Sequence, residues 1–444
     1  MKGKLTLFNT LGNRYESFES IRDGGVGIYV CGPTVNGVPH LGHARQQITF
    51  DILRKYLRHL GYNVKFVSNI TDVDDKIIAA AQLASEDLGR FTEKNLAAHT
   101  EDYARIGVEA PDFQPRATQH IGGMVNLVGR LKDNGFAYII PGDGVYYDVS
   151  KFTNYGALSG QDTSALLAGT RKAANDRKRN FADFVLWKFS KPGEPEWDSP
   201  WGKGRPGWHI ECSTMSAEFL GLPFDIHCGG QDLIFPHHED EIAQSEAAYG
   251  VKIANYWIHN GLVNVDNVKM SKSFGNFRTI RDLLLDYSGE AIRYFVLSSH
   301  YRKPVNFSRA SLDDARNSIE RLRGLASSIE EEDIVNTNYL AEFEGAMSYD
   351  LNTPRALSVV WHVAKDNQAK GRTKVLKIMD KVLGLGLFGS NAFDISDEIK
   401  KLAVERTVAR KQRDWKRADK LRELLNGMGW QINDTSCGYK LKKI

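Results

Sequence analysis

The chain has 444 residues, with 58 lysine and arginine against 55 aspartate and glutamate residues, so its net charge is only +3. At about 100–200 residues per domain, this length predicts two to four domains. Hydrophobic residues make up 42% and charged residues 25%, which excludes wholesale disorder, a collagen-like chain and a coiled-coil rod. With no apolar stretch of about 18 residues and no secretory signal, we expect a cytoplasmic protein without membrane spans. Four cysteines are too few for a disulfide scaffold and favour free thiols or metal ligation.

Short apolar runs alternate with helical patterns in the first part of the chain. Residues 28–30 predict a buried strand, apolar residues recur at helical spacing over 43–60, and residues 64–67 predict the next strand. A strand–helix–strand unit normally means a parallel sheet. Residues from about 110 to 200 are rich in Gly, Pro and Trp and break the alternation, so we interpret them as an insertion. The alternation resumes with a strand at 224–227 and a following helix.

Beyond about Ser308 the pattern is wholly helical, and the end of the chain is basic. From Lys400 to Ile444 there are 13 Lys/Arg and 5 Asp/Glu, a net charge of +8. The rest of the chain has 45 basic and 50 acidic residues, a net of −5, by subtraction from the totals of 58 and 55. A basic tail on a mildly acidic body is typical of a segment that binds a polyanion, although a solvated helix face is an equal alternative.

A strand-to-helix turn at residues 39–45 carries His40, Gly42 and His43. A helix N-terminus presents free N–H groups and a partial positive charge, which suits phosphate. Glycine lets a nucleotide approach the backbone closely, and imidazole N–H groups can donate to phosphate oxygens. Two histidines near a helix start can equally be surface or capping residues, so the pattern alone leaves both readings open.

A second candidate for phosphate binding lies at residues 269–273, where Lys269 and Lys272 bracket small polar residues. Such a loop can place ammonium groups on the charge that develops as pyrophosphate leaves. A solvated loop of lysine and serine is the alternative. The two patterns at the two ends of one α/β domain are more specific together than either alone.

Metal-ligating residue types gather near the predicted strand ends. Cys31 ends the first strand, and His237 and Glu241 share one face of a predicted helix because they are four residues apart. With Cys212 they offer two thiolates, an imidazole and a carboxylate, which suit zinc. Buried inert cysteines beside a surface helix are the alternative. Further possible ligands are His209, His227, Cys228, His238 and Glu239.

Longer strings resemble the cysteinyl-tRNA synthetases, a family of class I aminoacyl-tRNA synthetases. They include the two candidate phosphate-binding segments at 39–45 and 269–273, which are called the first and second phosphate strings below. The others are Tyr-Val-Cys-Gly-Pro-Thr at 29–34, Thr-Asp-Val-Asp-Asp-Lys at 71–76, Gly-Trp-His-Ile-Glu-Cys at 207–212 and the run 235–245. The resemblance runs from about Leu5 to the C-terminus. It implies an α/β fold: a Rossmann-like parallel-sheet catalytic domain with an inserted connective segment, followed by an all-helical C-terminal anticodon-binding module. It also implies a monomer that uses ATP, L-cysteine and cysteine tRNA.

The resemblance also assigns site residues. One zinc ion per chain is expected on Cys31, Cys212, His237 and Glu241, where it would select a substrate thiolate over the hydroxyl of serine. Catalysis is expected from His40, His43, Lys269 and Lys272, with Mg²⁺ on the phosphates of ATP. The expected ATP contacts are His40, Gly42, His43, Gly229, Gly230, Asp232 and Lys272, and the expected cysteine contacts are Thr71 and Trp208.

Five segments are expected on this basis: 1–110 and 201–307 as the two halves of the catalytic domain, 111–200 as the insertion, 308–399 as a helical bundle and 400–444 as the basic part of the anticodon module. The chain departs from the family pattern at Asn36-Gly37, at Asp240 and near Cys437.

Two alternative functions remain open. One is the related ligase that joins cysteine to an amino-sugar inositol in mycothiol synthesis, and the other is a catalytically silent paralogue that binds tRNA or zinc.

Overall fold

The computed structural model describes residues 4–161, 177–270, 277–388, 397–435 and 438–443. The chain forms two compact units, Met1–Phe388 and Gly389–Ile444. Each is described by itself below. None of the helices in the described ranges has both the length and the apolar character that a bilayer crossing needs.

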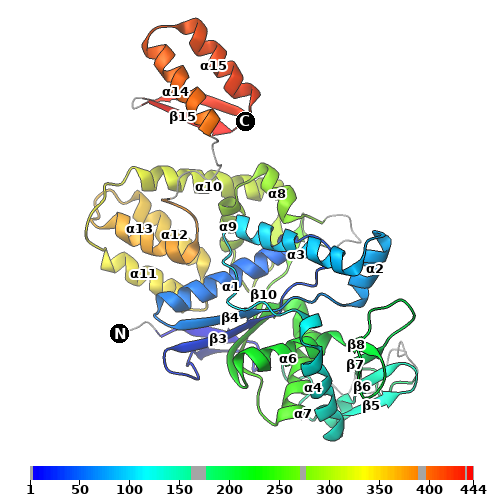
Figure 1. Cartoon of the computed structure of the whole chain (residues 1–444). Coiled ribbons are helices and arrows are strands. Elements are labelled where there is room, and N and C mark those ends of the chain that lie inside the picture. Colours follow the sequence, from blue (N-terminus) through cyan, green and yellow to red (C-terminus); the bar gives the residue numbers. More distant parts are fainter. Residues whose placement is uncertain (1–3, 162–176, 271–276, 389–396, 436–437, 444) are drawn as a thin grey trace. The chain divides into compact units, whose positions relative to one another are not determined.

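A parallel sheet of four strands lies at the centre of the first unit (Figure 1). Its order is β10-β9-β3-β4, and the chain leaves β3 towards β4 on one side but builds β9 and β10 on the other. The boundary between β3 and β9 is therefore a topological switch point, where ligands bind at the carboxyl ends of strands. The predicted parallel-sheet architecture is confirmed. The strands are β3 (Gly25–Val30), β4 (Asn63–Ser68), β9 (Phe224–Gly230) and β10 (Ala254–Asn260).

Helices cover both faces of this sheet, as the buried strand residues require. On one face, α1 (Leu41–His59) packs against Ile28 and Val30 through the apolar positions that the helical spacing predicts. On the other, α4 (Ile121–Asp133), α6 (Trp208–Leu220) and α7 (Glu239–Tyr249) enclose Tyr29 and Trp257 in a second core. Figure 1 shows α1 and α6 on opposite sides of the strands.

The segment 137–206, which begins inside the expected insertion and ends a few residues beyond it, forms a small antiparallel sheet in the order β5-β6-β7-β8. Two helices precede α4, namely α2 (Asp75–Leu83) and α3 (Leu88–Arg105). The strands are β5 (Ala137–Ile140), β6 (Gly144–Tyr147), β7 (Phe184–Phe189) and β8 (Gly204–Pro206), and an N-terminal hairpin is made by β1 (Thr6–Asn9) and β2 (Arg14–Ser17).

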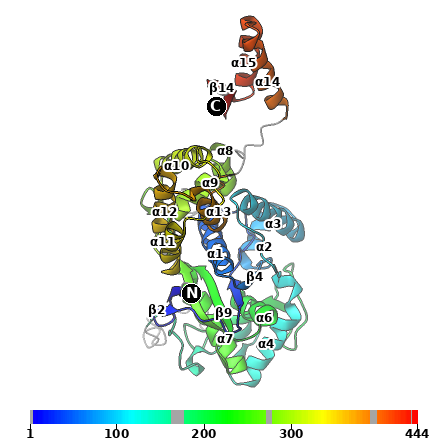
Figure 2. The same ribbon diagram turned by 90° about the vertical axis from the view of Figure 1, so that its left-hand side faces the viewer.

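The helices between residues 309 and 383 share the core of the sheet and do not form a separate one. Their apolar faces merge with α1 and the sheet in one continuous cluster that runs from Leu5 to Leu387. Figure 2 shows α13 beside α1, and the Tyr56 hydroxyl of α1 lies 2.6 Å from that of Ser348 in α11. The elements of this half are β11 (Val263–Val265), β12 (Val268–Lys269), α8 (Ile280–Asp286), α9 (Gly289–Leu297), β13 (Val305–Phe307), α10 (Arg309–Ser327), α11 (Thr337–Ser348), α12 (Thr353–Lys365) and α13 (Arg372–Leu383).

The second unit corrects the expectation of an all-helical C-terminal part. After α14 (Asp397–Lys411) and α15 (Trp415–Gly427), the chain forms an antiparallel hairpin of β14 (Trp430–Thr435) and β15 (Gly438–Lys443). Gly429, with φ of 81°, ends the helical run, and Trp430 and Ile432 then alternate into the core as strand residues do. This period-two pattern is short and lies among charged residues, so the sequence analysis did not identify it as a strand.

Candidate metal centre and nucleotide site

Several of the expected site residues lie at the carboxyl edge of the sheet, at the switch point. Cys31 follows β3 directly, and its backbone N–H donates to the carbonyl of Cys228 in β9. Gly229 and Gly230 end β9, and His40 precedes α1. Segments about 200 residues apart in sequence thus meet at one edge because parallel strands place their carboxyl ends together.

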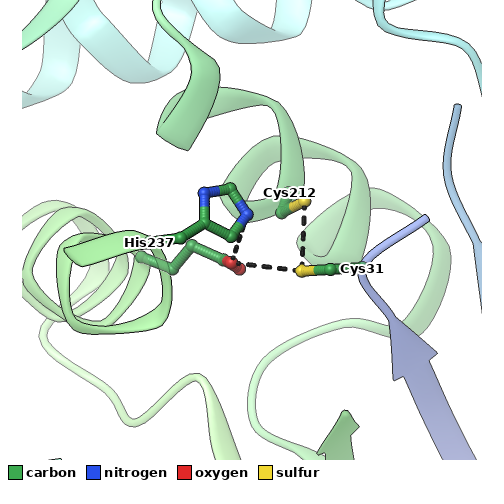
Figure 3. Close-up of side chains that lie close together, drawn as sticks. Cys31, Cys212 and His237 are labelled. Atoms are coloured by element: carbon green, nitrogen blue, oxygen red, sulfur yellow. Dashed lines mark hydrogen bonds and ion pairs between the residues drawn. The ribbon is translucent and has the colours of Figure 1, made fainter. Parts of the chain in front are cut away.

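Four ligand side chains form a buried cluster there: Cys31, Cys212, His237 and Glu241, with donor atoms within 4.8 Å of one another. Figure 3 shows the two thiols and the imidazole directed at a common point. The Cys31 Sγ lies 3.5 Å from Cys212 Sγ and 3.4 Å from Glu241 Oε1, and His237 Nε2 lies 3.1 Å from the same oxygen. Two sulfurs, one nitrogen and one carboxylate oxygen fit the donor set of a zinc site.

A second group overlaps the first and shares Cys31 and Glu241, but uses His227 and His238. Here each histidine lies close enough to donate to one of the two shared residues. His227 Nε2 is 2.8 Å from Glu241 Oε2, and His238 Nε2 is 3.2 Å from Cys31 Sγ. N–H groups in these places stabilise a carboxylate and a thiolate and orient them, as outer-shell partners of metal ligands do. This geometry favours the first group as the metal ligands. His227 and His238 would then be outer-shell residues that orient Glu241 and Cys31.

Further contacts fix these rings. The Thr10 hydroxyl can donate to His259 Nδ1 at 2.7 Å, and His259 Nε2 to His238 Nδ1 at 2.8 Å, which leaves the proton of His238 on Nε2, facing Cys31. His237 Nδ1 lies 2.9 Å from His209 Nδ1. His209 Nε2 in turn lies 3.4 Å from Asp240, whose other oxygen accepts from the hydroxyl of Tyr155. Asp240, one of the departures from the family pattern, thus places a carboxyl group behind the imidazole pair, and burial raises the pKa of that group well above its usual range.

Burial sets the protonation of these groups. It raises the pKa of the Cys31 thiol well above its usual range and that of Cys212 to about 11. It lowers the pKa of His237 well below its usual value, and that of His209 to about 3. The imidazoles are thus neutral, which is the form that binds metal, and a bound cation would favour loss of the thiol protons.

The two expected cysteine contacts flank the cluster. The half-buried Trp208 stacks on the His237 ring, with centroids 4.2 Å apart. Thr71 is buried after β4, and its hydroxyl donates to Glu211 Oε2 at 2.6 Å. Trp208 therefore lies against one candidate ligand, and Thr71 contacts the residue that precedes another, Cys212.

The first phosphate string forms the N-terminus of α1. His40 caps the helix, and its Nδ1 accepts from the backbone N–H of Gly42 at 3.1 Å and of His43 at 3.4 Å. His43 Nδ1 accepts in return from the His40 N–H at 3.2 Å, and the rings stack at 3.7 Å. A Cβ placed on Gly42 would lie 2.9 Å from the His40 ring, so glycine is required for this packing. The capping role that the sequence left open is present, and it orients both rings at the sheet edge.

The glycines at the end of β9 also make room for side chains. A Cβ on Gly229 would lie 2.7 Å from the His238 ring, and one on Gly230 would lie 2.5 Å from Asp232 Oδ1. Asp232 is exposed at this strand end. The turn therefore keeps the backbone open at the switch point while it accommodates a buried imidazole.

The second phosphate string is described only in part. The backbone of Lys269 belongs to β12, whereas Lys272 lies outside the described residues. Met270 packs near Gly42, 3.4 Å from where its Cβ would be. The chain that follows pairs with the first string: the N–H of Leu41 donates to Arg278 and that of Ile280 to Pro39. The chain that follows the second string therefore lies directly against the first string.

Three contributors escaped the sequence analysis. Buried Arg45, two residues after His43, donates to the carbonyls of Gly261 and Tyr301 and ties the start of α1 to the next strand ends. His259 contacts His238, which in turn contacts Cys31. His99 contacts the carbonyl of Gly37, in the loop that differs from the family pattern. An arginine beside a phosphate motif and two histidines inside apolar patterns were the available signals, but each fits many other roles.

Comparisons with known proteins show the family of the chain. The family model described as the class I (C) catalytic domain of tRNA synthetases matches residues 17–317. The cysteine–tRNA ligase of Thioalkalivibrio sulfidiphilus (strain HL-EbGR7) is 46% identical over 449 residues, covering 97% of this chain and 98% of the relative. That of Methylobacillus flagellatus (strain ATCC 51484 / DSM 6875 / VKM B-1610 / KT) is 46% identical and covers 99% and 100%.

Solved structures show the same fold at low identity. A methionyl-tRNA synthetase of Mycobacterium tuberculosis, in complex with methionyl-adenylate, superposes with a TM-score of 0.58 at 16% identity, over 85% of this chain and 94% of that one. The Agrobacterium radiobacter K84 agnB2 LeuRS in a ternary complex with tRNA and LeuAMS gives a TM-score of 0.59 at 12% identity, over 84% and 85%. The resemblance in the sequence is confirmed: the chain belongs to the cysteine–tRNA ligase family of class I aminoacyl-tRNA synthetases.

Proposed function

We propose that the chain joins L-cysteine to cysteine tRNA in two steps. The carboxylate of cysteine attacks the α-phosphorus of ATP, which forms cysteinyl-adenylate and releases pyrophosphate. A hydroxyl of the terminal tRNA adenosine, the 2′-hydroxyl in this class, then attacks the acyl carbon, and AMP leaves. The observation that carries this proposal is the buried cluster of two thiols, an imidazole and a carboxylate beside the capped start of α1.

The cluster explains how cysteine can be selected. One small group in an apolar pocket discriminates by only about 1–3 kcal/mol. Zinc, when bound to Cys31, Cys212, His237 and Glu241, supplies a soft Lewis acid with room for the substrate sulfur, which it prefers strongly to a hydroxyl. The chain's own part is to orient these ligands through His227 and His238, and to flank the substrate with Trp208 and Thr71.

ATP would lie along the same edge. The stacked rings of His40 and His43 face its phosphates, Gly42 permits close approach, and the β9 end at Gly229 and Gly230 with Asp232 receives the ribose. Lys269 and Lys272 supply positive charge as pyrophosphate departs, with Mg²⁺ on the phosphates. Little side-chain acid–base chemistry is required, so positioning and charge stabilisation carry most of the rate.

The basic second unit would bind the anticodon region of the tRNA. Its exposed Arg413, Lys416 and Arg417 can contact RNA phosphates. Such a unit favours a tRNA ligase over the mycothiol-pathway ligase, which has no tRNA to bind. The two relatives match over 97% and 99% of this chain, second unit included. Action as a cytoplasmic monomer is part of the same proposal.

One experiment separates the alternatives. The purified chain is incubated with ATP, Mg²⁺ and cysteine, with or without cysteine tRNA, and both ATP–pyrophosphate exchange and charged tRNA are measured. We expect cysteine-dependent exchange, no exchange with serine, and charging of tRNA. Lys272→Ala should slow adenylate formation by about 10²–10³ without changing cysteine affinity. Exchange without tRNA charging would favour the mycothiol-type ligase, and neither activity would favour a silent paralogue.

A further inference from the structure

Helix α3 buries an unusual stripe. Asn95, His99 and Asp102 lie at i, i+4 and i+7, so they share one face, and each is at most 5% exposed. A helix normally buries apolar side chains at this spacing, because a buried polar group costs free energy unless it is hydrogen-bonded. Packing alone would be satisfied by leucine or alanine. The stripe therefore requires an explanation in its partners.

Two of these side chains hold the loop that leads from Cys31 to His40. The Asn95 amide donates to the carbonyl of Val35 at 3.2 Å, and His99 Nε2 lies 3.0 Å from the carbonyl of Gly37. This loop contains the Asn36-Gly37 departure from the family pattern. The loop before the first phosphate string is thus held through its backbone carbonyls, which accept hydrogen bonds from side chains of α3.

The protonation of His99 follows from its partners. The Gly37 carbonyl can only accept, so Nε2 carries the proton, and Nδ1 accepts from the Tyr103 hydroxyl at 3.0 Å. Burial lowers the pKa of His99 to about 4, which keeps the ring neutral. Its ring centroid lies 5.4 Å from that of His43. His99 therefore adjoins both the loop and one of the expected catalytic side chains.

The third side chain contacts α8, the helix that follows the second phosphate string. Asp102 accepts from Arg281 Nε and Nη2, each at 3.2 Å, a two-point contact that fixes the guanidinium plane. Arg281 follows Ile280, whose N–H donates to Pro39 at 3.0 Å. One helix thus fastens the chain before His40 and the chain after the second string.

We propose that α3 braces the start of α1 against the start of α8, with His99 and Asp102 as positioning residues that set the spacing between these two helix starts for ATP. This inference rests on the proposed function for the identity of the nucleotide. The reason is geometric: an in-line attack needs the α-phosphorus, the first string and the departing pyrophosphate aligned, and a displacement of about 1 Å can cost about 10²-fold in rate. Neither residue needs to touch ATP for this effect.

The test compares nearly isosteric changes in the full chain. Asp102→Asn weakens the two-point contact, and Arg281→Gln removes it from the other side. Glu101→Gln is the matched control, because Glu101 lies on the same helix, 3.8 Å from the same guanidinium, but is 65% exposed. His99→Leu removes the donor to Gly37, while His99→Gln retains an amide N–H that can restore it.

Two measurements are made well below each variant's melting temperature: ATP affinity by calorimetry with Mg²⁺ and no amino acid, and cysteine-dependent ATP–pyrophosphate exchange. We expect Asp102→Asn, Arg281→Gln and His99→Leu to weaken ATP affinity or kcat by roughly 10- to 100-fold, with KM for cysteine and bound zinc unchanged. The double variant at Asp102 and Arg281 should be no worse than the worse single one. Glu101→Gln should match the wild type, and His99→Gln should recover most of the loss.

Equal losses for ATP and cysteine, or a change in melting temperature without a change in ATP affinity or kcat, would overturn the brace and leave α3 a structural helix. The direct ATP measurement keeps this result separate from the proposed function. If the wild type binds ATP but exchanges with no cysteine, the substrate assignment fails while the ATP affinities still decide the brace. A wild type that binds no ATP refutes both.

Discussion

Replacing His227 by phenylalanine should weaken metal binding without removing a ligand. His227 is fully buried in β9, and its ring stacks on Trp257 with centroids 4.4 Å apart and planes at 13°. Its Nε2 lies 2.8 Å from Glu241 Oε2, while Glu241 Oε1 faces Cys31 and His237. Phenylalanine keeps the stacked ring and deletes only the donor.

The expected magnitude has two parts. Loss of an outer-shell partner typically costs about 10- to 100-fold in metal affinity, which is about 1.4–2.7 kcal/mol. Glu241 Oε2 also becomes a buried acceptor without its partner, at about 1–3 kcal/mol. That second cost is present with and without metal, so it appears in the free energy of unfolding and not in the metal affinity.

The assay is competition for zinc with a chromophoric chelator, alongside denaturant unfolding of the metal-free protein. His120→Phe is the control: His120 Nδ1 also lies 2.8 Å from a glutamate, but that side chain, Glu218, is 52% exposed and outside the cluster. His227→Gln should recover part of the affinity because its amide can donate to Glu241. Wild-type zinc affinity in folded His227→Phe would refute the view that His227 orients Glu241 as a ligand.

Three further predictions concern other parts of the chain. Cys212→Ser should lower zinc content and abolish cysteine-dependent exchange while ATP affinity stays; exchange that survives loss of zinc would contradict direct sulfur–metal binding. Charge reversal at the exposed Arg413, Lys416 and Arg417 should spare exchange but flatten the log–log salt dependence of tRNA binding by about 0.7–0.9 per lost contact, and an unchanged KM for tRNA at physiological salt would make the tail a solvated face. Because burial lowers the pKa of His99 to about 4, the unfolded chain binds its proton first as pH falls below about 6.5. Stability should therefore decrease from pH 6.5 towards 4, and His99→Gln should remove up to about 1.4 kcal/mol per pH unit of that slope in chemical denaturation; an identical slope in wild type and variant would show that His99 is not buried neutral.

The sheet and much of the candidate metal centre could be predicted because their signals are local. Apolar runs at 28–30, 64–67 and 224–227 mark three of the strands, and the rule that parallel strands end at one edge places Cys31 there. The i,i+4 relation of His237 and Glu241 holds in α7 and the segment before it. These steps need only periodicity and the direction of the strands.

The choice among histidines could not be made in this way. His237 and His238 are neighbours in sequence, and both rings reach the cluster, one near Glu241 and the other near Cys31. What distinguishes them is the partner on the far side of each ring: His209 for one, His259 for the other. Those partners come from α6 and β10, and no local pattern pairs them. The family resemblance supplied the choice that spacing left open.

The sequence analysis missed the C-terminal hairpin and the polar stripe on α3 for a related reason. In the tail, Trp430 and Ile432 alternate as a strand does, but the pattern is too short to outweigh the helical stretches before it. In α3, Asn95, His99 and Asp102 have helical spacing, yet a polar stripe on a helix normally faces water. Only the packing of α3 against the loop at Gly37 and against Arg281 turns that face inward. Polar side chains at a regular spacing thus carry two opposite meanings, solvent or site. The test between them is whether the buried polar side chains have partners in a functional segment, which Asn95, His99 and Asp102 have at Val35, Gly37 and Arg281.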